Sequence, residues 1–455
     1  MMQAPATSIA PALPGESLRR WLDARGPYAS YVYSYPHKTA YRPFDTPIPL
    51  SELWRPQRRD RLSLYVHVPF CEMRCGFCNL FTEVRPGEGI AEAYVASLER
   101  QVARVRGALG ADARFSRIAF GGGTPSFLEP ALLGRLLDVA EIGMGASLRA
   151  LPTSFETSPA TATAERLAMV AERGIDRISI GIQSFFDDEL KAVGRPTTVG
   201  AAEAALDRIR AAGIPTLNVD LIYGIGGQTV QSWLQSVRSS LRWRPEELYL
   251  YPLYVRPLTG LGRKGLAWDD QRLECYREAL ALLTDAGYRQ VSMRMFRRAD
   301  AAVTDAPVYR CQEDGMIGLG CGARSYTREL HYSDEWAVTT RGVRGIIADW
   351  VSRPTDSFDT AWHGHRLSPL DQRTRYLLQS LLQTSGLDLA AYRRRFASDP
   401  FADRPELNEL IAEGMAFGAG ELLRLTASGL ELSDSIGPWL YSDNVTAAMN
   451  GYVLR

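Results

Sequence analysis

Short apolar runs alternate with amphipathic segments over much of the chain. The apolar runs include SLYVHV, RIAF, IDRISIGI, TLNVDLIY and ELYLYPLY, and the segments between them space their apolar residues as helices do. Mostly apolar runs are typical of strands buried on both faces of a parallel sheet, and the intervening segments supply the crossover helices. From residue 63 onward about six such units follow one another, which predicts an α/β fold with a partial TIM-type (β/α)6 barrel.

The pattern changes toward the end of the chain. From about residue 366 the sequence DQRTRYLLQSLLQTSGLDLAAYRRRF favours helices, and LRLTASGLELSD predicts two strands around a glycine turn. We therefore expect four regions. They are an N-terminal extension or lid (1–60), the barrel (61–300), a barrel closure with a glycine-rich connection (301–365), and a small, mostly helical C-terminal domain (366–455).

Polar residues and glycines stand where several of these apolar runs end. Because the active sites of TIM-type barrels lie at the carboxyl ends of the strands, these positions are candidates for a site. Glu156, Gln183 and Asp220 each follow an apolar run, and Arg195 lies beyond a short helical segment. Three consecutive glycines, 121–123, would bring the backbone close to a ligand and leave amide groups free to bind it. Taken singly, each feature also fits an ordinary solvated strand end.

The composition is that of a globular protein without a charge-selected partner. The chain has 455 residues, 45% of them hydrophobic, and Lys plus Arg and Asp plus Glu both number 52. This balance gives no reason to expect a nucleic acid or an anionic membrane surface as partner. No apolar run is long enough to span a membrane, and the start lacks a basic region followed by a hydrophobic segment. We therefore predict a cytoplasmic protein.

Three of the six cysteines form a C-x3-C-x2-C group, Cys71, Cys75 and Cys78. Six cysteines are too few for a secreted disulfide scaffold of this length. A structural zinc site usually needs a second pair of Cys or His, and the other three cysteines are isolated along the chain. The spacing suits three irons of a four-iron cluster whose fourth iron stays open to another ligand. The alternative is a chance grouping of small buried cysteines.

The cysteine group behind LYVHVPF resembles that of the radical S-adenosylmethionine (SAM) enzymes. The tyrosine, histidine and proline of this lead-in resemble the oxygen-independent coproporphyrinogen III oxidase branch, and the resemblance runs from about residue 28 to the C-terminus. In that family the open iron binds the amino and carboxylate groups of SAM, and an electron from the cluster cleaves SAM to a 5′-deoxyadenosyl radical. The resemblance implies a [4Fe-4S] cluster, one or two molecules of SAM, a small-molecule substrate, and an electron donor such as flavodoxin or ferredoxin.

The resemblance also assigns roles to individual residues. Cys71, Cys75 and Cys78 would hold the cluster, and His67 would orient neighbouring groups without binding iron. Tyr65 would lie near the sulfonium of SAM, although a tyrosine packed in the barrel is an equal alternative. The remaining expected contacts to SAM are Gly122, Gly123 and Thr124 at its amino end, Glu156, Gln183 and Asp220 at its ribose and amino groups, and Arg195 at its carboxylate.

The tyrosine-rich segment GPYASYVYSYPHKTAYRPF resembles the N-terminal segment that lies over the barrel mouth in the oxidase branch. We expect a lid over a flat conjugated substrate that bears carboxylates, or else a strap over the outer helices. In addition, Gly318, Gly320 and Ala323 match a glycine-rich stretch that the family has on the substrate side of SAM.

The family has several possible reactions. We expect abstraction of a hydrogen atom from a small conjugated or heteroaromatic substrate. The alternatives are coproporphyrinogen III oxidation itself, C-methylation or cyclopropanation that uses two molecules of SAM, and a role as a heme chaperone. One departure bears on this choice, because the oxidases carry a further cysteine two residues after the third cluster cysteine, where this chain has Leu80.

Overall fold

The computed structural model describes residues 15–264, 270–302 and 310–453. A 13-stranded sheet in the order β1-β15-β14-β13-β12-β2-β5-β6-β7-β8-β9-β11-β10 forms its centre. Six parallel neighbours in this sheet follow the order of the chain, which confirms the predicted partial (β/α)6 barrel. They are β2 (Leu62–Val68), β5 (Phe115–Gly122), β6 (Thr153–Thr157), β7 (Arg177–Gln183), β8 (Thr216–Tyr223) and β9 (Glu247–Pro252).

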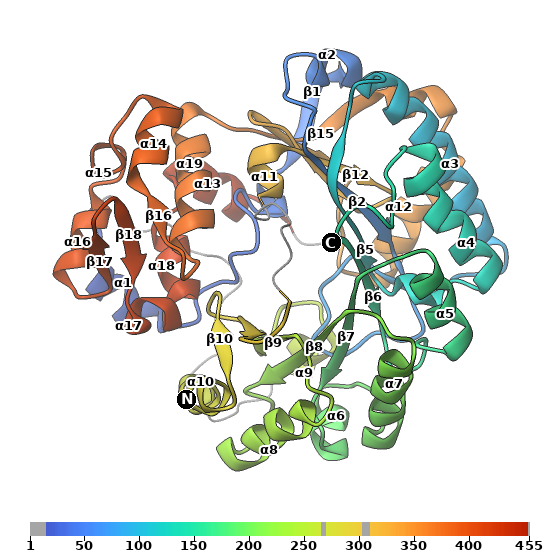
Figure 1. Cartoon of the computed structure of the whole chain (residues 1–455). Helices are drawn as coiled ribbons and strands as arrows, with labels where there is room; N and C mark the ends of the chain where they lie inside the picture. Colours follow the sequence, from blue (N-terminus) through green and yellow to red (C-terminus); the bar gives the residue numbers. More distant parts are fainter. Residues whose placement is uncertain (1–14, 265–269, 303–309, 454–455) are drawn as a thin grey trace.

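Helices cover the outer face of these strands, as Figure 1 shows. In β2 the side chains of Leu64, Val66 and Val68 are almost fully buried in the main core, whereas Tyr65 between them is only half-buried. Side chains alternate between the faces of a strand, so Tyr65 and His67 face the inside of the barrel. The covering helices are α3 (Ile90–Leu109), α4 (Pro130–Asp138), α5 (Ala164–Glu172), α7 (Val199–Ala211), α8 (Val230–Leu241) and α10 (Arg272–Asp285).

Further strands extend the sheet beyond both ends of the six. Strand β12 (Met316–Leu319) pairs in parallel with β2 and places Gly318 beside Tyr65. Next to it lie the antiparallel strands β13 (Arg324–Tyr326), β14 (Leu330–Ser333), β15 (Thr360–Arg366) and β1 (Arg42–Pro49), and the other end carries β11 (Met295–Arg298) and β10 (Tyr288–Gln290). An N-terminal strand therefore belongs to the same sheet as the barrel.

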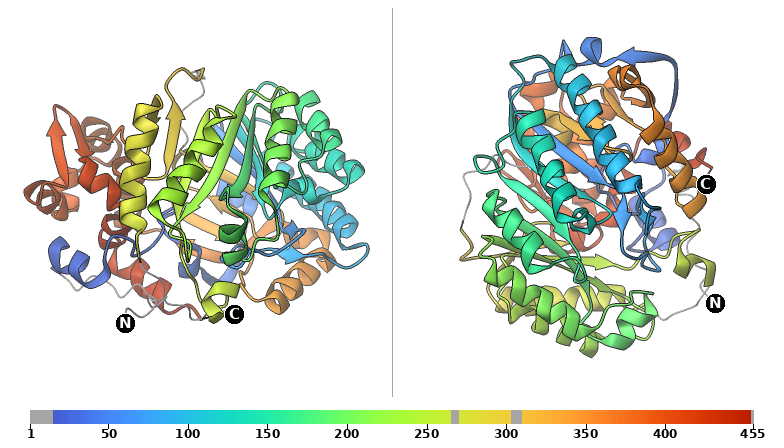
Figure 2. Two further views of the ribbon diagram at one scale, coloured as in Figure 1. Left: turned by 90° about the horizontal axis from the view of Figure 1, so that it is seen from below. Right: turned by 90° about the vertical axis from the view of Figure 1, so that its right-hand side faces the viewer.

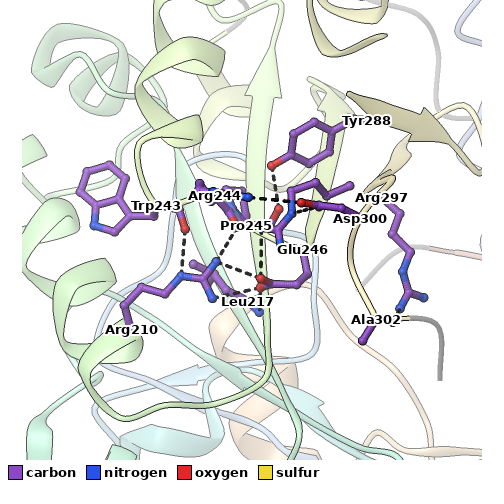
Figure 3. A network of polar contacts seen from close by, with 11 residues as sticks. Arg210, Leu217, Trp243, Arg244, Pro245, Glu246, Tyr288, Arg297, Asp300 and Ala302 are labelled. Atoms are coloured by element: carbon purple, nitrogen blue, oxygen red, sulfur yellow. Dashed lines mark hydrogen bonds and ion pairs between the residues drawn. The ribbon is translucent and has the colours of Figure 1, made fainter. Parts of the chain in front are cut away.

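A polar network joins the start of β9 to the hairpin β10–β11 and to helix α7 (Figure 3). Glu246 is its centre, because its carboxylate accepts from Nη1 of Arg210 at 3.0 Å and from the amide of Leu217 at 2.9 Å. Arg298 of β11 pairs with the same carboxylate at 3.2 Å. This network holds the amino ends of the strands, opposite to the carboxyl ends where the predicted site residues lie.

A second core lies beside the barrel. It is mostly helical and contains α13 (Pro369–Leu381), α14 (Leu389–Phe396), α16 (Glu406–Ala412) and α18 (Ser433–Trp439), the red and orange region of Figures 1 and 2. The N-terminal helix α1 (Leu18–Arg25) packs into this core, and Nε1 of its Trp21 donates to the carbonyl of Ser435 at 3.0 Å. The two ends of the described chain therefore share one core.

The expected strand pair in LRLTASGLELSD is wrong. Only its first part is a strand, β18 (Leu422–Leu425), and this strand pairs with the preceding β17 (Ala416–Ala419). The chain then turns into helix α17 (Ala427–Glu431), because the side chain of Thr426 accepts from the amide of Gly429 and caps the helix. The turn glycine of the hairpin is Gly420, with φ +61°, and not Gly429. Across the described residues, no helix is long and apolar enough to cross a membrane.

Candidate active site

The cysteine loop lies against the mouth of the barrel. It begins at Cys71, the last residue of β3 (Phe70–Cys71). The amide of Gly76 donates to the carbonyl of Val193 at 2.8 Å, and the amide of Leu261 donates to the carbonyl of Gly76 at 2.8 Å. A Cβ atom at Gly76 would lie 2.8 Å from the Val193 oxygen, so the close approach of the loop backbone to Val193 requires glycine at this position. The loop is therefore held from two sides.

The three thiols of this loop are half-buried and face polar neighbours. The Cys71 sulfur lies 3.4 Å from Oγ1 of Thr124, and the Cys75 sulfur accepts from Nη1 of Arg195 at 3.2 Å. Burial raises the pKa of Cys71 to about 12 and also raises that of Cys78, so both remain thiols until a metal replaces their protons.

The donor set fits an iron–sulfur cluster better than a single metal ion. Within the described ranges, no group of three His, Cys, Asp or Glu side chains could hold one metal ion. In a four-iron cluster each thiolate binds a different iron, so three thiolates that hold three of the irons do not converge on one point. Cys71, Cys75 and Cys78 are the residues that would hold such a cluster.

The glycine run at the end of β5 allows three groups to approach it closely. A Cβ atom at Gly121 would lie 2.7 Å from the Glu156 carboxyl carbon, and one at Gly122 would lie 2.5 Å from the His67 ring. At Gly123 it would lie 3.0 Å from the Cys71 sulfur. The glycines therefore let the cysteine loop, His67 and Glu156 meet at one place.

The expectation of free amide groups is wrong for two of the three glycines in this run, and the next amide, that of Thr124, is also bonded. The amide of Gly122 donates to Oε2 of Glu156 at 3.1 Å. The amides of Gly123 and Thr124 donate to the carbonyls of Val68 and Phe70, both at 2.7 Å. These backbone donors hold the site together and are not open to a ligand in this structure.

Two carboxyl groups of the barrel, Glu156 and Asp220, interact electrostatically. Glu156 is open to solvent from the barrel interior, yet the surrounding protein and the charge of Asp220 raise its pKa to about 7. Burial also raises the pKa of Asp220 to about 6. Nδ2 of Asn218 opposes this shift by donating to Asp220 at 2.8 Å, and Oγ of Ser179 lies at 3.4 Å. Near neutral pH Glu156 is therefore partly protonated while Asp220 is largely ionised.

Gln183 and Arg195 meet at the end of β7. The β7–β8 register shifts between Gly181 and Gln183, and Gln183 has φ +75°, a left-handed conformation that is unusual outside glycine. Nη2 of Arg195 donates to the carbonyl of Gly181 at 2.5 Å, while its buried Nε has no partner in the described chain. Arg195 thus connects the position of this register shift to the cysteine loop, and its Nε remains as a donor for a ligand.

Tyr65 and His67 form a hydrogen-bonded pair on β2. The Tyr65 hydroxyl lies 3.0 Å from Nδ1 of His67, and Nε2 of His67 lies 3.4 Å from the carbonyl of Phe81. Burial lowers the pKa of His67 to about 4, so the imidazole is neutral at pH 7. A neutral ring with its proton on Nε2 satisfies both contacts, with the Tyr65 hydroxyl as the donor to Nδ1. His67 therefore orients Tyr65.

The predicted site residues form one connected set. Arg195 contacts Cys75 and acts electrostatically on Asp220, Asp220 acts on Glu156, and Glu156 accepts from Gly122. Tyr65 also belongs to this set. Burial raises the pKa of Tyr65, and the charge of Glu156 raises it further. Gly122 and Glu156 stand at or next to the carboxyl ends of β5 and β6, whereas Tyr65 and Asp220 stand within β2 and β8.

Sequence reasoning did not identify several charged groups near this end of the barrel. Arg294 pairs with Asp434 of the second core, and its guanidinium lies 3.9 Å from the ring centre of Tyr31. Arg324 lies 4.8 Å from the ring centre of Tyr33. The only signal for Arg324 was its position next to the glycine-rich stretch, while Arg294 and Asp434 stand in ordinary amphipathic sequence.

Comparisons with known proteins identify the class. Residues 65–239 match the Radical SAM superfamily. An oxygen-independent coproporphyrinogen III oxidase of Bradyrhizobium diazoefficiens is 31% identical over 383 residues, 79% of this chain and 82% of the relative. The heme chaperone HemW of Escherichia coli is 31% identical over 275 residues, 58% of this chain and 69% of the relative.

A solved structure supports the same fold. Coproporphyrinogen III oxidase (HemN) from Escherichia coli matches with a TM-score of 0.76 and 23% identity, covering 93% of this chain and 98% of that one. The chain is therefore a radical SAM enzyme. Within that superfamily it belongs to the oxygen-independent coproporphyrinogen III oxidase-like family, and membership implies a [4Fe-4S] cluster and SAM.

Proposed function

We propose that this enzyme cleaves SAM reductively at the cysteine loop and abstracts a hydrogen atom from a small conjugated or heteroaromatic substrate. The observation that carries the proposal is the position of Arg195, which contacts Cys75 of the loop and the carbonyl of Gly181 at the end of β7. Through this side chain the groups proposed to hold the cluster and those proposed to hold SAM form one site.

The residues of the site would have separate roles in the proposed reaction. Cys71, Cys75 and Cys78 would hold the cluster, and the guanidinium of Arg195 would bind a carboxylate beside it. Gln183 and Asp220 would bind hydroxyl and amino groups, and the pKa of about 6 leaves Asp220 largely ionised at pH 7. When bound, the cluster and SAM would supply one-electron cleavage of the sulfonium and a carbon-centred radical.

Further groups would orient ligands and exclude water. Glu156, with its pKa of about 7, can hold a proton on one carboxyl oxygen while the other accepts from Gly122. The neutral His67 fixes the hydroxyl of Tyr65. Residues 28–44 would act as the lid, since Tyr31 packs against Tyr251 of β9 with ring centres 6.1 Å apart. A closed site protects a radical from solvent and from side reactions.

The identity of the substrate and the product of the reaction are also proposed here. The relatives include oxidases that act on coproporphyrinogen III and a heme chaperone, at the same 31% identity. Leu80, 48% exposed, stands where the oxidases of the family carry a further cysteine, which supports a reaction that differs from theirs. We propose flavodoxin or ferredoxin as electron donor, because the chemistry needs single electrons.

Product analysis after anaerobic incubation with isotopically labelled SAM tests this proposal. 5′-Deoxyadenosine that gains hydrogen from a candidate substrate supports hydrogen abstraction. Formation of S-adenosylhomocysteine as well would indicate methyl transfer with a second SAM. Stoichiometric heme binding with almost no SAM turnover would contradict the proposal and favour a chaperone. Coproporphyrinogen III is the first candidate substrate to test, and its turnover would assign the oxidase reaction.

A further inference from the structure

A guanidinium without a carboxylate partner faces the inside of the barrel beside β2. Arg324 of β13 is half-buried, and its Nη1 donates to Oγ of Ser34 at 3.2 Å. The groups that act on its charge most strongly after burial are tyrosine hydroxyls, among them those of Tyr33 and Tyr65. Over the part of the chain that the structure describes, no Asp or Glu forms an ion pair with Arg324. A cation removed from water without a counter-ion costs free energy, which a bound anion would recover.

A second cation faces the same space. Lys38, one of three lysines in the chain, is half-buried, and its Nζ lies 3.9 Å from the ring centre of Trp336. Burial lowers the pKa of Lys38, and the charge of Arg324 lowers it further. Among the described residues no carboxylate pairs with Lys38 either. The two positive charges therefore repel each other, and no Asp or Glu of the described residues forms an ion pair with either of them.

Aromatic rings border the same space. The guanidinium carbon of Arg324 lies 4.8 Å from the ring centre of Tyr33. The His37 ring lies edge-on to the Tyr33 ring, with ring centres 5.3 Å apart. Tyr33 is 39% exposed, although its neighbours in the segment are more buried. An exposed ring next to unpaired cations suits a ligand that is both flat and anionic.

This space is separate from the one that Arg195 occupies. Arg324 acts electrostatically on Tyr65 and His67, which belong to β2, whereas Arg195 contacts the end of β7. Strands β5 and β6 lie between β2 and β7 in the sheet. The charge of Cys78 acts on the pKa of Lys38, so Lys38 lies near the cysteine loop. The barrel therefore has one guanidinium for the carboxylate of SAM and a second cationic position across the interior.

We propose that Lys38 and Arg324 form a carboxylate-binding subsite for a second ligand in the barrel, with Tyr33 packing against the adjoining part of that ligand. This inference rests on the proposed function, because it names a group by which the substrate would be held next to SAM. A carboxylate could come from the substrate or from a second molecule of SAM, and the experiment distinguishes these sources.

The test uses two probes that share one flat ring and differ in charge, 1-pyrenecarboxylate and 1-pyrenemethanol. Their binding to the cluster-loaded, full-length protein is measured by anaerobic equilibrium dialysis with one equivalent of SAM present. We expect the carboxylate to bind about tenfold more tightly than the alcohol, as a charge-assisted hydrogen bond would give. Arg324→Gln should remove this preference and Lys38→Gln should reduce it. The matched control is Arg328→Gln, an exposed arginine four residues further along the same hairpin.

The outcomes separate the proposal from its alternatives. Retention of the preference in Arg324→Gln, or its loss in Arg328→Gln as well, overturns the subsite. If Arg324→Gln does not fold, as judged by circular dichroism and iron content, Arg324→Lys decides, because a retained cation should retain the preference. A separate dialysis at saturating labelled SAM then counts the SAM molecules bound per cluster and identifies the source of the carboxylate. Loss of one SAM per cluster in Arg324→Gln assigns the carboxylate to a second SAM, and an unchanged count assigns it to the substrate.

The dialysis does not depend on turnover, so the two proposals can fail separately. A protein that shows the Arg324-dependent preference and does not cleave SAM would keep the subsite and overturn the proposed function. A protein that cleaves SAM and binds both probes equally would keep the function and overturn the subsite.

Discussion

Arg195 donates from Nη1 to the sulfur of Cys75 at 3.2 Å and from Nη2 to the carbonyl of Gly181 at 2.5 Å. One guanidinium, 120 residues from Cys75 along the chain, therefore connects the cysteine loop to the end of a barrel strand. Its Nε is buried and has no partner among the described residues. The side chain is thus placed to bind a ligand that lies between the loop and the strand.

The first prediction concerns this side chain. Arg195→Gln should weaken SAM binding by about 1.5–3 kcal/mol, the usual contribution of a hydrogen bond to a charged group. Iron content and the visible absorption of the cluster should stay close to those of the parent protein. Isothermal titration of the cluster-loaded protein with SAM measures the change, and Arg238→Gln, an exposed arginine on α8, is the control. Unchanged SAM affinity in Arg195→Gln would remove this residue from the proposed binding site.

The second prediction concerns the cluster ligands. Cys75→Ala should lose the cluster, because three thiolates are needed to hold three irons. Cys275→Ala should keep it, since Cys275 is a buried residue of α10 in the main core. Iron and sulfide analysis after anaerobic reconstitution measures both. A full complement of iron in Cys75→Ala would show that the loop is not the cluster site.

The sequence predicted the barrel well because its signal is local. Each buried strand is a continuous apolar run, and the C-x3-C-x2-C spacing is contained within eight residues. The contact of Arg324 with Ser34 and the Arg294–Asp434 ion pair could not be predicted, because each joins segments far apart in the chain. The second strand expected after a glycine turn at Gly429 is wrong for another reason. Thr426 caps a helix there, and this local hydrogen bond prevails over the alternating pattern.

The third prediction concerns pH. The folded protein raises the pKa of Glu156 from an ordinary value of 4.5 to about 7, so protonated Glu156 favours the folded state. This contribution is complete below about pH 4.5 and is lost as the pH rises through about 7. Glu156→Gln cannot ionise, so its thermal midpoint should rise relative to that of the parent protein between pH 5 and pH 8. We expect no such trend for Glu88→Gln, an exposed control.

This pH dependence can be measured by differential scanning fluorimetry on anaerobic, SAM-free protein. A difference between Glu156→Gln and the parent that stays constant over the whole pH range would contradict the raised pKa.

The fourth prediction concerns the contact between the two cores. Asp434 and Arg294 form an ion pair whose side chains are 1% and 8% exposed, and Tyr254 donates to the same carboxylate. Asp434→Asn would leave the buried guanidinium without a counter-ion, which typically costs about 3–5 kcal/mol. Denaturant unfolding measures the loss. Asp300→Asn, which breaks an exposed pair with Arg298, should change stability little, and equal effects of the two variants would contradict this assignment.

The central claim is that the cysteine loop and the strand ends form one SAM-cleaving site. The most direct measurement is the yield of 5′-deoxyadenosine when the cluster-loaded protein is incubated anaerobically with SAM and dithionite. The account predicts 5′-deoxyadenosine from the parent protein and from Cys275→Ala, and none from Cys75→Ala. A parent protein that carries a complete cluster, binds SAM and releases no 5′-deoxyadenosine would contradict it.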